Sequence, residues 1–179
     1  LTDSPRATLT SFLRLRDEFE ETLQIYRSKK SREIAEKLLV INAQFQALLD
    51  LSSAPPSSRR TIGVETTAFL LDIFGRVKLP NLASVPGEEA FDDDVSPAKW
   101  RIPGTPIRIV RIDEGAREGE FLFSKRTVMA APRFYQAIHD LPLQTTLPII
   151  SWHRAIPQIT GPMIPAAVLR SVPQSLRDF

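Results

Sequence analysis

Apolar residues recur at spacings of three, four and seven along most of the first 78 residues, and this periodicity constrains the fold more than any other feature. Such spacing places apolar side chains on one face of an α-helix. The first stretch follows Ser4, a helix-capping residue type, with Pro5 at the first helical position, where a missing N–H has no cost. It predicts an amphipathic helix that ends near Arg27. The apolar face consists of Leu9, Phe12, Leu13, Phe19, Leu23 and Tyr26.

Two further stretches repeat this pattern. A second predicted helix is capped by Ser31 and ends before Pro55-Pro56, and a third runs from about Ser58 to Val77. Their apolar residues are Ile34, Leu38, Ile41, Phe45 and Leu48 in the second, and Ile62, Phe69, Leu70, Ile73 and Phe74 in the third. Three consecutive amphipathic helices on short connections are expected to pack as antiparallel neighbours around a shared core.

The segment 79–99 has the composition of a linker. Prolines and Gly87 interrupt it, and it carries the acidic residues Glu88, Glu89, Asp92, Asp93 and Asp94. Because polar, proline-punctuated segments are typical of exposed connections, this one is predicted to join the helical residues 1–78 to a mixed part, residues 100–179.

The pattern then changes to short β-branched runs. Residues 100–103 and 107–112 nearly alternate, and residues 120–123 follow a loop that contains Gly115 and Gly119, which predicts a β-hairpin. Ser124 is then expected to cap a further helix, interrupted or restarted at Pro132, with Phe134, Tyr135 and Ile138 on its apolar side. The predicted fold is a single α+β domain, predominantly helical, with a three-helix bundle followed by a hairpin and a further helix.

The last forty or so residues are apolar but too rich in proline for regular strands. Two interpretations are open. The segment leads toward a membrane, with Trp152 at the interface and the basic residues Arg154, Arg170 and Arg177 near anionic headgroups. Alternatively, it is an irregular segment that wraps around the domain.

Composition excludes several classes of protein. The chain has no cysteine, so it has no disulfide framework, thiolate metal site or cysteine nucleophile. It has no apolar run of about 20 residues, the length that spans a bilayer. The net charge is only +2, and no basic stripe with interleaved aromatics predicts a nucleic-acid partner. Because the chain starts at Leu1 rather than Met, we expect it to be a trimmed or processed piece of a longer protein.

The sequence predicts no catalytic, cofactor-binding or metal-binding residues. Phosphate-loop and nucleophile-elbow patterns are absent. The two histidines, His139 and His153, have no metal-ligand partners at helical spacing. An acid–base role for the carboxylates around the hairpin is less favoured than exposure in a turn. Those carboxylates are Asp113, Glu114, Glu118 and Glu120.

Three arginines of the hairpin, Arg108, Arg111 and Arg117, lie close together in sequence. They could bind a phosphate or an acidic partner, or form cross-strand ion pairs with the neighbouring carboxylates. Ion pairs are the preferred interpretation, because opposite charges across strands stabilise a hairpin.

Several runs of residues resemble a region that precedes the membrane spans in bacterial channels of the small-conductance mechanosensitive, or MscS-like, family. The most specific are the strings GEFLFS at 119–124 and PRFY at 132–135. The others are residues 100–107, Thr127-Val128, Leu141-Pro142 and, resembling the approach to the first span, residues 161–165. The pore-lining helix and the cytoplasmic vestibule of the family have no counterpart here, so no gating or conducting residue is carried over.

The resemblance implies an accessory domain on the periplasmic side of the bacterial inner membrane, contributing to channel assembly or tension gating. Its implied partners are its own transmembrane channel region, sibling subunits and the membrane surface near its C-terminal end. The alternative is a periplasmic sensor or scaffold module that binds cell-envelope material or a partner protein. A deep cleft lined by Trp100, Phe121, Phe123 and Tyr135 would favour the alternative, and a packed core at those positions would count against it. An enzyme is not expected.

Overall fold

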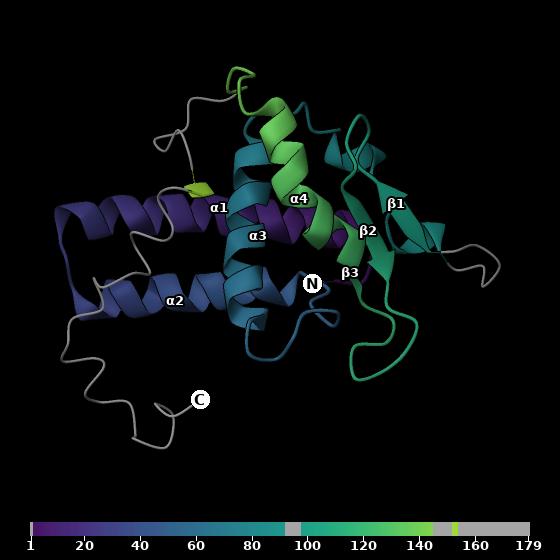
Figure 1. The fold of residues 1–179 in the computed structure, drawn as a ribbon, viewed down its shortest axis with the longest axis horizontal. Helices are drawn as coiled ribbons and strands as arrows, with labels where there is room; N and C mark the ends of the chain where they lie inside the picture. The colour runs from purple at the N-terminus through teal and green to yellow at the C-terminus, as the bar shows by residue number, and fades with distance from the viewer. Residues whose placement is uncertain (1, 92–97, 145–151, 154–179) are drawn as a thin grey trace.

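The computed structural model of the chain describes residues 2–91, 98–144 and 152–153. In these residues the helices are α1 (Pro5–Ser28), α2 (Arg32–Ala47), α3 (Arg59–Phe74) and α4 (Lys125–Ile138). The strands are β1 (Lys99–Arg101), β2 (Arg108–Arg111) and β3 (Phe121–Phe123), which form one antiparallel sheet (Figure 1). The predicted fold class, α+β and predominantly helical, is confirmed. None of the described helices combines the length and the apolar character that a bilayer crossing requires.

The predicted helix starts are confirmed by their caps. The Ser4 hydroxyl accepts a hydrogen bond from the Ala7 N–H at 3.1 Å, and Ser31 does the same for Ile34 at 3.2 Å. These bonds satisfy N–H groups that have no acceptor inside the helix, which fixes where each helix begins.

Helices α1 and α2 pack as antiparallel neighbours, as predicted, but α3 runs across the pair (Figure 1). The connection from α2 to α3 explains this difference. Leu49 forms a parallel bridge with Phe123 of β3, so the chain visits the edge of the sheet before α3 begins. Helix α3 then packs beside α4, and it is not the third parallel rod of a bundle.

The core lies where α1, α2, α3 and β3 meet, around the fully buried ring of Phe12. This ring is in edge contact with three others, at centroid distances of 4.9 Å to Phe45, 5.1 Å to Phe74 and 5.4 Å to Phe123. Most of the predicted apolar faces are buried here. Leu13, Tyr26, Ile34, Ile62, Phe69 and Phe134 are only partly buried.

Residues 79–91 match the predicted exposed linker only in part: Asn81, Glu88 and Glu89 are exposed, but other residues of the segment pack on the domain. This segment forms two short 3-10 helices, η1 (Leu82–Ser84) and η2 (Glu88–Ala90), and between them Val85 is fully buried. Arg6 of α1 holds the segment, donating its Nε–H to the Val85 carbonyl at 2.8 Å. Phe91 packs on Phe121 with ring centroids 4.8 Å apart. Prolines prevent regular structure here, but they do not prevent an apolar side chain from entering the core. Asp92, Asp93 and Asp94 lie outside the described residues.

The predicted hairpin is present as β2 and β3, and residues 99–101 add a third strand beside β2. Gly104 has a φ of +73° in the connection from β1 to β2, a conformation that favours glycine. Side chains alternate between the faces of the sheet, so Ile109, Phe121 and Phe123 face the core. The opposite face, called here the outer face, carries Lys99, Arg101, Arg108, Val110 and Leu122.

Helix α4 is continuous through Pro132, where the sequence predicted an interruption. Its cap is as predicted, since the Ser124 hydroxyl accepts a hydrogen bond from the Thr127 N–H at 3.2 Å. Ala131 and Tyr135, on either side of the proline, are buried in the core. Their packing holds the helix together despite the missing N–H.

Candidate functional site

A buried carboxylate of α3 holds a segment that is 80 residues away in sequence. Asp72 is 1% exposed and accepts hydrogen bonds from the backbone N–H of Trp152 at 2.6 Å and of His153 at 3.0 Å. Its Oδ2 also lies 2.7 Å from Nδ1 of the His153 ring. We call Asp72, Trp152 and His153 the Asp72 clamp. It ties residues 152–153 to the middle of the helical core.

Aromatic rings enclose the two residues that Asp72 holds. The His153 ring stacks on Phe69 at a centroid distance of 5.4 Å and lies 4.6 Å from the ring of Tyr135. Trp152 is 1% exposed and packs against Phe19 of α1 at 5.5 Å. The structure therefore places Trp152 inside the domain. At this residue the interpretation of a segment packed on the domain is favoured over a position at a membrane interface. The rest of the tail, including residues 161–165 and the three basic residues, lies outside the described part.

Arg76, one turn after Asp72, adds polar contacts beside the clamp. It is 6% exposed, and its Nη1 donates to the Asp72 carbonyl at 3.0 Å. Its Nε donates to the His139 carbonyl at 3.2 Å, and its guanidinium lies 5.6 Å from the centre of the Tyr135 ring. Arg76 thus joins the C-terminal ends of α3 and α4 next to the Asp72 clamp.

The sequence gives neither histidine a metal-ligand partner at helical spacing, and it does not reveal the carboxylate that each of them contacts in the structure. His153 contacts Asp72, and His139 lies 3.2 Å from the carboxylate of Asp140, which is exposed. No cluster of three or more metal-ligating side chains occurs among residues 2–91, 98–144 and 152–153. The Asp72–His153 pair is packed among rings, an arrangement suited to anchoring a segment.

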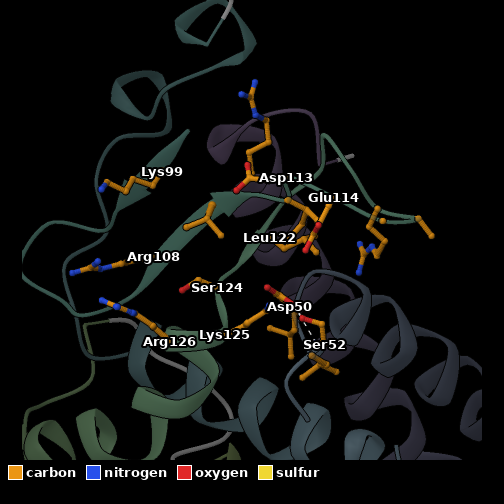
Figure 2. A pocket seen from close by; sticks show the side chains of 18 of the residues that line it. Asp50, Ser52, Lys99, Arg108, Asp113, Glu114, Leu122, Ser124, Lys125 and Arg126 are labelled. Carbon is orange, nitrogen blue, oxygen red and sulfur yellow. Dashed lines mark hydrogen bonds between the residues drawn. The ribbon is translucent and has the colours of Figure 1, made fainter. Parts of the chain in front are cut away.

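A second feature is a cleft of about 1000 Å³ between the outer face of the sheet, the start of α4 and the connection from α2 to α3 (Figure 2). Val110 and Leu122 of the sheet line it together with Leu49 and Leu51. Its polar lining is mainly basic. Seven basic side chains line the cleft: Arg59, Lys99, Arg108, Arg111, Arg117, Lys125 and Arg126. Against these stand the acids Asp50, Asp113 and Glu114.

The strand register puts like charges opposite each other at this cleft. Arg101 of β1 is the direct partner of Arg108 of β2, and Lys99 is two residues along the same face. Like charges in direct cross-strand register destabilise a sheet. Among the described carboxylates, none forms an ion pair within 4.0 Å of Lys99, Arg101, Arg108, Lys125 or Arg126. Within the described part of the chain, these five positive charges therefore lie near one another without an ion-pair partner.

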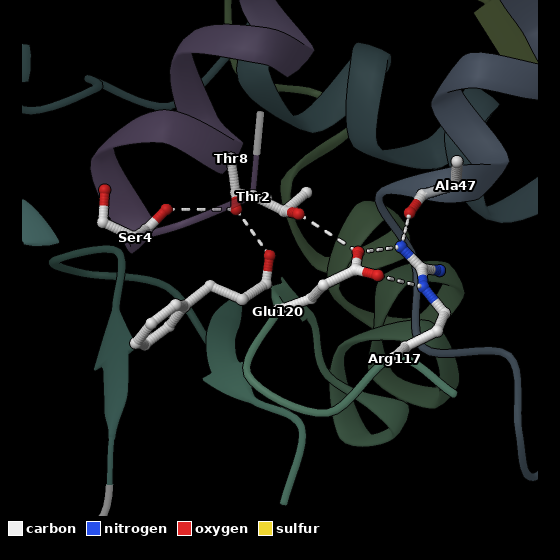
Figure 3. Close-up of polar contacts among 7 residues, drawn as sticks. Thr2, Ser4, Thr8, Ala47, Arg117 and Glu120 are labelled. Carbon is white, nitrogen blue, oxygen red and sulfur yellow. Dashed lines mark hydrogen bonds and ion pairs between the residues drawn. The ribbon is translucent and has the colours of Figure 1, made fainter. Parts of the chain in front are cut away.

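Arg117 pairs with a hairpin carboxylate, but it does so within the loop and not across the strands, as the sequence had predicted. Among the described residues, Arg108 has no such ion pair. The Arg117 guanidinium contacts both carboxylate oxygens of Glu120, at 3.2 and 2.6 Å, and also donates to the Ala47 carbonyl (Figure 3). Glu120 in turn accepts a hydrogen bond from the Thr2 hydroxyl at 3.1 Å. This network joins the N-terminus, the end of α2 and the hairpin. Asp113, Glu114 and Glu118 are exposed, in agreement with their predicted place in a turn.

The Glu120 network predicts a pH-dependent stability. The hydrogen bond from Arg117, followed by that from Thr2, holds the pKa of Glu120 below its usual value of 4.5. A lowered folded-state pKa stabilises the fold above the unfolded-state pKa, and this contribution is lost as the pH falls through the folded-state value. Glu120→Gln is expected to cost about 0.5–1 kcal/mol at pH 7, because the pair is partly exposed.

Urea denaturation at a series of pH values tests this expectation. The difference between wild type and Glu120→Gln should be full at pH 7 and should shrink as the pH falls below 4.5. Glu118→Gln, in the same loop and exposed, is the matched control. A Glu120 effect that persists unchanged in acid would contradict an electrostatic role for this carboxylate.

Comparison of the chain with protein-family models, with curated proteins and with solved structures finds no match in any of the three.

Proposed function

We propose that this chain is an extracytoplasmic accessory domain of a membrane channel related to the small-conductance mechanosensitive family. In this role it contributes to assembly or tension gating from the periplasmic side of the inner membrane, next to its own channel region and sibling subunits. The proposal rests on the resemblance, and several of the residues that carry it have structural positions in this chain. Phe121 and Phe123 are buried strand residues, Ser124 caps α4, and Tyr135 is buried beside α3.

The observation that carries the proposal is the Asp72 clamp. It fixes the chain at residues 152–153 on the core, and the string that resembles the approach to the first membrane span follows at residues 161–165. Force applied to the chain beyond His153 would reach α3 through the Asp72 carboxylate and through the packing of Trp152 on Phe19. In our proposal the clamp is the mechanical link between the helical core and a channel region that follows.

The parent reading frame provides the first test. Its hydropathy after Phe179, averaged over a window of about 19 residues, should show several membrane spans, one of them rich in glycine and alanine. A reading frame that continues into no membrane span would refute the proposal.

The alternative is a periplasmic sensor or scaffold module that binds cell-envelope material or a partner protein, and a deep cleft lined by four aromatic residues would favour it. Phe121, Phe123 and Tyr135 are buried, and Trp100 packs against the same core. These rings fill the interior of the domain and do not line a cleft, which counts against this form of the alternative.

A further inference from the structure

We propose that the basic cleft on the outer face of the sheet binds a small phosphorylated ligand that carries at least two negative charges. Lys99, Arg108 and Arg126 would contact its phosphate oxygens. This inference goes beyond the channel proposal and does not depend on it, because it rests only on the charge and shape of the cleft.

Charge is the first support. Seven basic side chains line the cleft and only three acidic ones do, and one of the seven, Arg117, is paired with Glu120. The other lining residues therefore include six basic side chains against three acidic ones. The acid Asp50 is already hydrogen-bonded to the hydroxyl of Ser52 at 2.5 Å, and it is buried. A ligand with two or more negative charges would therefore meet a strongly positive potential.

Placement is the second support. Lys99, Arg108 and Arg126 come from β1, β2 and the first turn of α4, and Figure 2 shows their side chains extending toward the same side of the cleft. Arg101 and Arg108 are direct cross-strand partners, and the repulsion between their like charges destabilises the sheet. A carboxylate at either position would replace this repulsion with attraction. A bound anion would compensate this repulsion.

The geometry of the donors favours phosphate. Guanidinium groups offer planar pairs of N–H donors that match two phosphate oxygens. Lys125 and Arg126 lie in the first turn of α4, where backbone N–H groups have no acceptor within the helix. A volume of about 1000 Å³ is large enough for a small molecule or a lipid headgroup. Phosphate is the chemistry common to both sources.

Two probes distinguish a free phosphorylated compound from a headgroup. Sodium tripolyphosphate is titrated into the chain by calorimetry, and the chain is floated with vesicles of phosphatidylcholine alone or mixed with cardiolipin, a lipid whose headgroup carries two phosphates. Binding of tripolyphosphate without vesicle binding would support the proposal with a soluble ligand. Binding only to the vesicles that contain cardiolipin would support it with a headgroup. Absence of binding to both probes at millimolar phosphate and low salt would overturn it.

The variant Arg108→Gln with Arg126→Gln is expected to weaken binding of the active probe by about tenfold or more, because each lost contact is a charge-assisted hydrogen bond. Arg133→Gln is the matched control, since Arg133 is exposed on the same helix α4 outside the cleft, and it should retain the wild-type affinity. Equal weakening by the control would overturn the site and would leave only non-specific attraction to a basic protein.

Thermal stability separates binding from a structural role. Arg108→Gln removes the repulsion with Arg101, so without ligand its melting temperature should equal or exceed that of wild type. Stabilisation by the active probe should nevertheless be lost. A melting temperature below that of wild type would show that Arg108 supports the fold and would contradict the assignment.

Discussion

Replacing Phe12 with alanine is expected to lower the free energy of unfolding by about 3–5 kcal/mol, the usual cost of deleting a buried aromatic ring. Phe12 is fully buried and meets Phe45 of α2, Phe74 at the end of α3 and Phe123 of β3. In the described core, no other aromatic ring contacts rings of α2, α3 and β3 at the same time. The substitution would therefore leave a cavity at the point where the helices and the sheet meet.

Urea denaturation with a thermal melt measures this effect. For a domain of this size the melting temperature should fall by about 2–4 °C for each kcal/mol lost. Met129→Ala is the control, because Met129 is 73% exposed on α4 and its loss should change stability by less than about 0.5 kcal/mol. A loss below about 1 kcal/mol for Phe12→Ala would contradict the packing described here.

Asp72→Ala is expected to have the second largest effect, a loss of about 3 kcal/mol. The Trp152 and His153 N–H groups would both lose a charged acceptor, and such hydrogen bonds contribute about 1.5–3 kcal/mol each. The partial release of residues 152–153 offsets part of this cost, because they can then bond to water. Asp140→Ala is the control, since the Asp140 side chain is 93% exposed and contacts only its neighbour His139 among the described ion pairs.

Fluorescence reports release of the clamp directly. The chain has two tryptophans, so in a Trp100→Phe background the emission comes from Trp152 alone. We expect blue-shifted emission from buried Trp152, and a red shift when Asp72→Ala is added. Emission that stays blue-shifted would show that packing against Phe19, without the carboxylate, is enough to hold Trp152 in place.

Local features of this fold are predictable from sequence because their causes lie within a few residues. Ser4, Ser31 and Ser124 cap helices through hydrogen bonds to N–H groups three residues away, so each cap is visible in the sequence. The apolar periodicity of α1 and α2 likewise identifies their buried faces. The fold class follows from these local signals.

Features that depend on distant contacts are not visible in this way. The direction of α3 depends on the Leu49–Phe123 bridge, and the burial of Val85 depends on Arg6. The partner of His153 is 81 residues away, and no spacing rule connects it to Asp72. Similarly, the sequence places Arg108 in a strand, but only the register reveals Arg101 as its direct neighbour.

The most direct test of the account is electrical recording from membrane patches that contain the full-length protein, with suction applied in steps. We predict tension-activated currents in wild type, a shifted activation tension in Asp72→Ala, and wild-type behaviour in Met129→Ala. A change in Asp72→Ala but not in the control would identify the clamp as part of the mechanical path. Absence of any tension-activated current from the wild-type protein at the membrane would contradict the proposed function.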